Sequence, residues 1–437
     1  MKASLKVALG VAIVLVITVV TLVSVLDVQW NSGGVKVIAA NESGIKAWGE
    51  YISTSYDKNT DSIGSIVLVG NVNDNPKLRS LWNLTDLPAS YSFSPHVILV
   101  RNVTFVTGTA SNIYLTANEL GIEFHPARLA TFIAVFLALV IVFTVAMEDS
   151  STRAFYVIIA FLIGVWSLNT SPSFTKPALK LFYSLLIKSS SLGLSPGWIS
   201  LENMFYAHVV LMLLTVTMIF YTAPRRFREL GFVISGLLMA VPMVRDQIST
   251  ISPLSLAFFI FATTIAMVSN FTFPENRRKS ILQTVTLSIF TSVSILLQPL
   301  TAILPIAFVL TFPRRKRNIL YLSMTAVGVV TGFVLGHAEW HAIWSALREE
   351  SVEVSWNSAL LQLALPLTLA SYLLLKGRVI MRSKGITPFT TILTLVLGFA
   401  SMLNPAIIPY FFLSLMIMVM RLMIGVEERG TKTLSPL

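Results

Sequence analysis

The stretch that decides the class of this protein is VALGVAIVLVITVVTLVSVL, residues 7–26, which follows Lys2 and Lys6. It is about 20 apolar residues long, enough for a helix to cross roughly 30 Å of hydrocarbon. A cleaved signal peptide has a shorter apolar core and a small-residue cleavage site, and the exit sequence SVLDVQW offers no such site. We therefore expect residues 1–26 to form an uncleaved signal-anchor helix.

Apolar runs of the same kind return after residue 127 and continue almost to the end of the chain. We predict a polytopic α-helical membrane protein with about twelve transmembrane helices, in which residues 128–437 form the multi-helix domain. Only Gln298-Pro299 separates two of the runs, so the count falls to ten or eleven if short runs merge or turn back. After the first run, the predicted spans are roughly 128–147, 154–168, 206–223, 230–244, 253–269, 281–297, 299–312, 318–336, 358–375, 386–402 and 406–424.

The composition agrees with a chain embedded in lipid. Of the 437 residues, 54% are hydrophobic and 12% are charged, whereas a soluble domain carries roughly 25% charged residues. The chain has no cysteine, which excludes disulfides, thiolate metal sites and cysteine nucleophiles. The lack of cysteine also fits a thermophilic source.

The formal net charge of +11 comes from short basic clusters between the apolar runs. Alternate loops read EDSSTR, PRRFRE, PENRRKS, PRRKR and KGRVIMRSK, and the intervening loops are poor in Lys and Arg. The positive-inside rule explains this alternation without a nucleic-acid partner. We therefore expect a multi-pass protein of the plasma membrane, with both termini cytoplasmic and residues 27–127 outside.

Residues 27–127 differ in character from the rest of the chain, because short apolar runs alternate there with Gly, Asn, Asp and Ser. The pattern predicts a small, mostly parallel α/β domain between the first and second transmembrane helices. It is net acidic, with nine Asp/Glu against six Lys/Arg. Strands are expected at 35–39, 65–70, 96–100 and 103–108. Helices are expected at 42–55, with Ile45, Trp48 and Ile52 on one face, and at 110–120, with Gly121 as the C-cap.

Two junctions in this domain join a strand to a polar loop, at IVLVG followed by NVNDNP (71–76) and at TFVTG followed by TASNIYLTANELG (109–121). Ligands of parallel sheets bind at the carboxyl ends of strands, so these loops are candidate binding sites, with a structural turn as the alternative. Residues 60–121 resemble the small α/β modules of archaeal surface-layer proteins. The resemblance implies a role in the cell envelope.

Asp27 lies just past the first span, in SVLDVQW. The outline of the chain resembles the GT-C class of membrane glycosyltransferases, which have a long external loop after the first helix. The resemblance implies a lipid-phosphate sugar donor used at the outer face, with Asp27 as a catalytic carboxylate. The class usually has paired acids in that loop, whereas this sequence has one.

Arg245 and Asp246 stand together in MVRDQIST, on the side of the membrane predicted for Asp27. An Arg binds a phosphate and a carboxylate takes a proton, so the pair is a second candidate catalytic group. The alternative is a dipeptide whose two charges pair with each other.

His337, Glu339 and His341 follow the ninth predicted span, in HAEWH. On a helix the two His side chains lie at i and i+4, a spacing that holds a divalent metal such as zinc. Trp340 and Trp344 favour a different interpretation, an interfacial anchoring segment. No other cofactor is indicated by the sequence.

Sequons for N-glycosylation occur at Asn41, Asn83, Asn102, Asn169 and Asn270. The first four fall outside in the predicted topology.

Three functions stay open at this point. The first is a GT-C-like envelope enzyme that uses a lipid-linked saccharide. The second is a non-enzymatic protein that docks on a surface-layer or other envelope protein. The third is a transporter or flippase for an amphipathic substrate, whose pathway needs few charged groups.

Overall fold

The computed structural model describes most of the chain, in two compact units that are considered separately. The first unit contains Met1–Glu148 and Phe161–Val210, and the second contains Asp149–Ala160 and Leu211–Leu437. The described residues are 9, 11–16, 36–39, 43–55, 63–64, 66–122, 124–147, 149–169, 174–192, 199–223, 228–270, 277–312, 315–336, 340, 344 and 386–433. Most of the predicted signal anchor and the predicted span 358–375 therefore lie outside the described residues.

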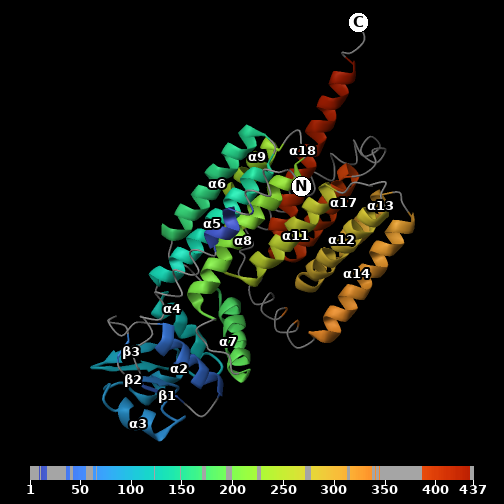
Figure 1. The fold of residues 1–437 in the computed structure, drawn as a ribbon. Coiled ribbons are helices and arrows are strands. Elements are labelled where there is room, and N and C mark those ends of the chain that lie inside the picture. Colours follow the sequence, from blue (N-terminus) through green and yellow to red (C-terminus); the bar gives the residue numbers. More distant parts are fainter. Residues whose placement is uncertain are drawn as a thin grey trace. The chain divides into compact units, whose positions relative to one another are not determined.

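A four-stranded sheet forms in the first unit, in the order β1-β2-β4-β3 (Figure 1). Its strands are β1 (Lys36–Ala39), β2 (Ile66–Val69), β3 (Val97–Val100) and β4 (Val103–Val106). The first, second and fourth strands are parallel, and β3 is antiparallel to β4. The predicted strands and the mostly parallel sheet are confirmed.

Helices cover the sheet from both faces. On one face, Trp82 of α3 (Pro76–Trp82) meets Phe105 edge to face, with ring centroids 5.5 Å apart. On the other face lies α2 (Ser43–Ser55), whose predicted apolar side, Ile45, Trp48 and Ile52, is buried. The remaining short elements are η1 (Ala89–Phe93), η2 (Ile113–Thr116) and α4 (Ala117–Leu120), which ends at the predicted C-cap Gly121 with φ +73°. The predicted helix 110–120 is thus a 3-10 turn followed by one α-helical turn.

Two helices of the first unit are not anticipated by the sequence: α3, whose seven residues are too few for a clear apolar periodicity, and α7 (Lys176–Ser191). Helix α7 packs on α2 and η2, although about 120 residues separate it from α2 along the chain. Phe182 meets both Trp48 and Tyr51 edge to face, at centroid distances of 6.2 and 5.3 Å. The apolar side of α2 is therefore buried by a helix from beyond residue 127.

Long apolar helices make up the rest of the described chain. Four of them are long and apolar enough to cross a membrane, or five if a pair bent by 95° counts as one span. The predicted total of twelve goes beyond this number, and five further apolar helices are shorter. The helices and 3-10 turns are α5 (Pro126–Ala146), α6 (Ser150–Asn169), α8 (Leu201–Thr222), α9 (Glu229–Ala240), α10 (Pro242–Ser249), α11 (Pro253–Ser269), α12 (Arg277–Leu297), η5 (Pro299–Ala302), α13 (Ile303–Thr311), α14 (Arg315–Leu335), α17 (Ile386–Leu403), η6 (Pro405–Ile407) and α18 (Ile408–Thr433).

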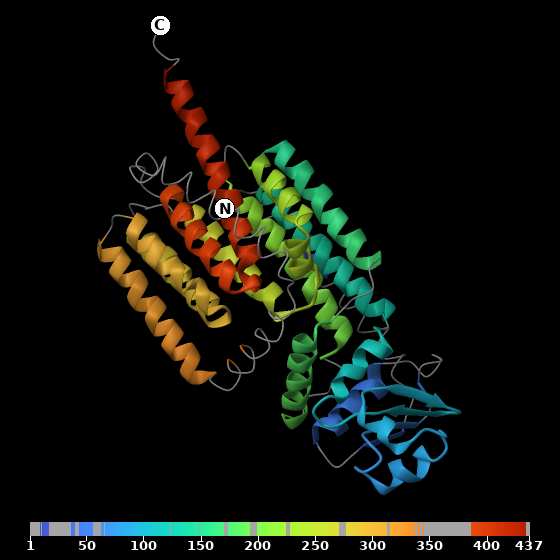
Figure 2. The same ribbon diagram turned by 180° about the vertical axis from the view of Figure 1, so that it is seen from behind.

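Helices α12 and α14 lie side by side in both views (Figures 1 and 2) and run in the same direction. Ser288 Oγ lies 3.4 Å from the Tyr321 carbonyl oxygen, and Ser292 Oγ lies 3.1 Å from that of Thr325. Residues later in α12 contact residues later in α14, so the two helices are parallel. The chain must therefore reverse direction between them. The runs 281–297 and 299–312 are therefore separate helices on either side of Gln298-Pro299.

Arg421 of α18 joins the ends of two other helices in the second unit. Its Nη2 donates to the carbonyl oxygens of Thr222 (3.1 Å) and Ser269 (3.5 Å), at the carboxyl ends of α8 and α11. Asn270 adds a bond from its side-chain nitrogen to the carbonyl oxygen of Tyr221. A cation near the carboxyl ends of helices is favoured by their dipoles.

The close contact of α12 with α14 depends on glycine. A Cβ atom at Gly328 would lie 2.5 Å from Ser292 Oγ and 3.0 Å from its Cβ, whereas one at Gly236 of α9 would meet nothing within 4 Å. We expect Gly328→Ala to cost about 1–3 kcal/mol through overpacking. The matched change Gly236→Ala should stabilise by up to about 1 kcal/mol, because alanine favours a helix over glycine. Unfolding of the detergent-solubilised protein measures both, and equal effects would contradict the prediction.

Candidate functional site

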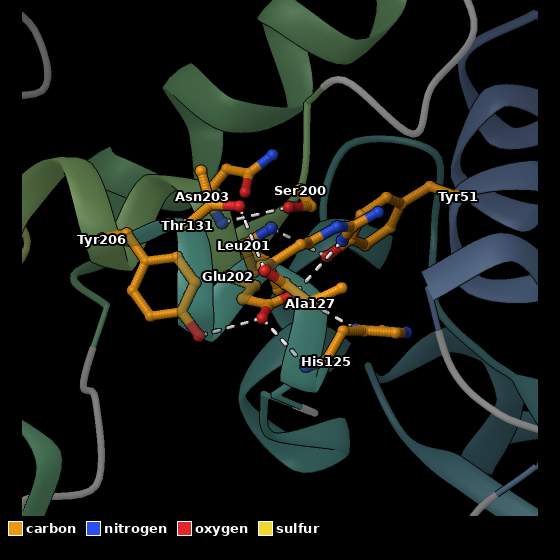
Figure 3. A network of polar contacts seen from close by, with 10 residues as sticks. Tyr51, His125, Ala127, Thr131, Ser200, Leu201, Glu202, Asn203 and Tyr206 are labelled. Atoms are coloured by element: carbon orange, nitrogen blue, oxygen red, sulfur yellow. Dashed lines mark hydrogen bonds and ion pairs between the residues drawn. The ribbon is translucent and has the colours of Figure 1, made fainter. Parts of the chain in front are cut away.

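The most concentrated group of charged side chains in the described part of the first unit surrounds Glu202, which is 2% exposed (Figure 3). Its Oε1 accepts hydrogen bonds from the backbone N–H of His125 (2.9 Å) and from the hydroxyl of Tyr206 (3.0 Å). Its Oε2 accepts from Arg128 Nη1 (3.2 Å) and lies 3.1 Å from His125 Nδ1. One carboxylate thus gathers a cation, an imidazole, a hydroxyl and a backbone amide.

Local sequence signals explain why these groups meet at helix starts. Ser200 Oγ accepts from the backbone N–H of Asn203 (3.0 Å), as an N-cap does, and Glu202 lies in the first turn of α8. His125 is the N-cap residue of α5, and Pro126 takes the first helical position. A carboxylate between two helix amino ends is stabilised by both dipoles. Glu202 and Tyr206, at i and i+4, share one side of α8.

Aromatic rings enclose this network. Phe132 stacks on Tyr206 at 4.5 Å, and Phe124 meets Phe205 at 5.5 Å. The backbone N–H of Leu201 donates to the hydroxyl of Tyr51 (2.9 Å), which ties the start of α8 to α2. Both carboxylate oxygens are fully engaged and shielded, so the arrangement suits holding helices together better than taking a proton from a substrate.

The two loops that follow the neighbouring strands β2 and β4 have the same local structure. Gly70 and Gly108 have φ of +130° and +133°, in the region that favours glycine. The backbone N–H of Asn71 donates to Asp74 Oδ2 (2.8 Å), and that of Thr109 donates to Asn112 Oδ1 (2.9 Å). These polar side chains are used within their own loops, which favours the structural-turn alternative.

A cavity of about 470 Å³ lies beside the first of these loops, on the exposed side of α3. Arg79 Nη2 donates to Asn73 Oδ1 across it (2.8 Å). Polar groups that donate and accept hydrogen bonds therefore stand next to two small apolar surfaces. The cavity is lined by Val72, Asn73, Pro76, Arg79, Ser80 and Asn83.

The residues predicted from the sequence as a site divide into two groups. Arg245 and Asp246 are exposed on α10 and pair with each other, with Nε 3.3 Å from Oδ1. This contact fits the alternative in which the two charges pair locally. Asp27, His337, Glu339 and His341 lie outside the described residues. Among the residues that are described, no group of three His, Asp or Glu side chains is arranged to hold a metal ion.

Trp340 and Trp344, the two tryptophans of this predicted segment, bond to the ends of helices. Trp340 Nε1 donates to the carbonyl oxygen of Gly332 (2.7 Å), and Trp344 Nε1 donates to that of Leu296 (2.6 Å). Both indoles thus bond to carbonyl oxygens in the last turns of α14 and α12, where intrahelical partners run out.

Comparison of the chain with protein-family models, with curated proteins and with solved structures finds no match.

The Glu202 network gives a prediction on stability. Glu202→Gln leaves Arg128 without its counter-ion, and we expect a loss of about 1.5–3 kcal/mol, as for a hydrogen bond between charged groups. The matched control is Glu50→Gln, because Glu50 forms an exposed pair with Lys46 at 3.8 Å and such pairs contribute about 0–1 kcal/mol. Urea unfolding, followed by tryptophan fluorescence, measures both. Equal losses would contradict a special role for Glu202.

Proposed function

We propose that the protein is a multi-pass protein of the cell envelope that holds its α/β domain outside the membrane and uses it to dock on another envelope protein. The observation that carries this proposal is a run of exposed apolar side chains along the segment from η1 to the edge strand β3, at Leu87, Tyr91, Phe93 and Leu99. We name it the η1–β3 surface.

Four large apolar side chains are exposed within a stretch of thirteen residues, with exposed fractions from 37% to 42%. The stretch runs through η1 into β3, the last strand of the sheet, which pairs only with β4 among the described residues. An edge strand leaves backbone N–H and C=O groups unpaired and available to a strand of another protein.

The Glu202 network supports a docking role as well. It ties the start of α5, which directly follows the domain, to the start of α8, and Tyr51 adds a contact from α2. Packing of α7 on α2 adds a further helix to the domain. A surface that must hold a partner benefits from such fixed attachment, because less freedom is lost on binding.

Membrane insertion is supported by the apolar helices and by the number of membrane crossings that helix packing requires. Helices α2 and α7 pack on each other, so they lie on one side of the membrane and the number of crossings between them is even. Two candidate spans, α5 and α6, lie between them along the chain. Two crossings are an even number, so Ser55, at the end of α2, and Lys176, at the start of α7, lie on the same side.

The ends of α8 and α11 give a second parity argument. Both bond to Arg421, so Thr222 and Ser269 lie at the same depth across the proposed membrane. The bent pair α9–α10 then crosses once and α11 crosses back, whereas a re-entrant α9–α10 would leave the two ends on opposite sides. The basic clusters PRRFRE and PENRRKS follow these ends, which indicates the cytoplasmic side.

The glycosyltransferase, the metal site and the transporter stay predictions. Asp27 and the two His residues lie outside the described residues, and Arg245 and Asp246 pair with each other. The GT-C resemblance is tested by Asp27→Asn and Asp246→Asn, each of which removes a charge with little change in volume. Loss of a general base costs about 10²–10⁴-fold in rate, so unchanged envelope glycans in both variants would exclude this function.

Sidedness is tested in the cysteine-free chain by single cysteines. Lys46 on α2 and Ser150 at the start of α6 are both exposed. We expect Lys46→Cys, and not Ser150→Cys, to react with a membrane-impermeant maleimide in intact cells. After the membrane is permeabilised, both should react. The reverse pattern in intact cells would contradict the proposed topology.

Docking is tested by a photo-crosslinking amino acid at Tyr91 or Leu99 in cells, with Lys46 as the matched exposed control. We expect one defined protein adduct from both positions of the η1–β3 surface and none from Lys46. Phe93→Asp should abolish the adduct, because a charge opposes an apolar contact. Adducts only to lipid, or the same adducts from Lys46, would contradict a protein partner.

A further inference from the structure

The surface of α3 carries a second feature, the sequon Asn83-Leu84-Thr85, at the carboxyl end of the helix. Asn83 is the C-cap residue and is exposed, and its side-chain amide has no hydrogen-bonding partner within the described part of the chain. Thr85 Oγ1 donates to the carbonyl oxygen of Trp82 (2.7 Å), one turn back. The whole acceptor motif therefore lies in one surface turn.

The other sequons are closed by the fold or lie outside its described part. In the Asn102 sequon, the hydroxyl-bearing Thr104 is fully buried, and its Oγ1 accepts from the backbone N–H of Gly64 (2.6 Å). The side-chain nitrogen of Asn270 is bound to the carbonyl oxygens of Ala266 (2.8 Å) and Tyr221. Asn41 and the side chain of Asn169 are outside the described residues.

Asn83 is itself one of the residues that line the cavity on α3. Asn73, Arg79 and Ser80 offer hydrogen-bonding groups, and Val72 and Pro76 offer apolar surface. Sugars present both hydroxyl groups and C–H faces, so this lining matches a saccharide. Leu84, next to Asn83, is 50% exposed, and an attached glycan would cover it.

We propose that Asn83 is an N-glycosylation site and that the cavity on α3 holds the first sugars of its glycan. The donor is a lipid-phosphate-linked oligosaccharide, handled by a separate membrane transferase. A bond forms between Asn83 Nδ2 and the anomeric carbon, and the bond from that carbon to the phosphate oxygen breaks. The lipid phosphate leaves with the electron pair, and the amide loses one proton to a base of the transferase.

This inference rests on the proposed outer location of the domain, and the experiment separates the two. Peptides of the protein purified from its native membranes are analysed by mass spectrometry. We expect a glycan on the peptide with Asn83 and none at Asn102 or Asn270. Thr85→Ser should keep the glycan, whereas Thr85→Val and Asn83→Gln should lose it.

Three outcomes would overturn the site, each in a distinct way. An unmodified Asn83, with Lys46→Cys labelled from outside, excludes glycosylation while leaving the topology intact. Failure of Lys46→Cys to react from outside contradicts the outer location of the domain and, with it, glycosylation of Asn83. A glycan on Asn102 instead of Asn83 also overturns the assignment.

The role of the cavity is tested by a double-mutant cycle. Arg79→Ala should lower the midpoint of thermal unfolding more in the glycosylated protein than in the Asn83→Gln background. The cycle removes the contribution of the Arg79–Asn73 hydrogen bond, which both backgrounds contain. Equal shifts in the two backgrounds would exclude contact between Arg79 and the glycan.

Discussion

Burial of the Glu202 carboxylate is the constraint on which the first unit depends. A charge removed from water needs partners that replace its hydration, and removal of one partner leaves the others buried and unsatisfied. Here the partners come from the first residues of α5 and from the next turn of α8, and Tyr51 of α2 binds the adjacent backbone. The starts of α5 and α8 are consequently held around one negative charge, and Tyr51 ties α2 to them.

The second unit is held together by a different set of interactions. Where lipid is the solvent, apolar side chains gain little by meeting one another, and close approach of helices depends on small residues and on hydroxyl groups. Helices α12 and α14 follow this rule, with Gly328 against Ser292 and with Tyr321 hydrogen-bonded through its hydroxyl to Thr291 (2.9 Å). Arg421 contributes a cation where two helices have run out of intrahelical partners.

The sequence predicted those features that depend on local patterns. The strands, the buried side of α2 and the apolar runs follow from periodicity, and Gly121 follows from the need for positive φ. Helix α7 was missed because its apolar side faces a helix about 120 residues away. Glu202 was missed for the same reason, since no local signal connects it with His125 and Arg128. The predicted Arg245–Asp246 site was based on two neighbouring residues, and their side chains pair with each other.

The 95° bend between α9 and α10 limits the hydrophobic length of this part of the chain. Helix α9 contains twelve residues and rises about 18 Å, well short of the roughly 30 Å of a typical hydrocarbon core. In a bilayer, lipids beside α9 would shorten or tilt to match this hydrophobic length, at a cost of a fraction of a kcal/mol per Å. The proposed crossing of the bent pair therefore implies a preference for thin regions of the membrane and for short-chain lipids around α9.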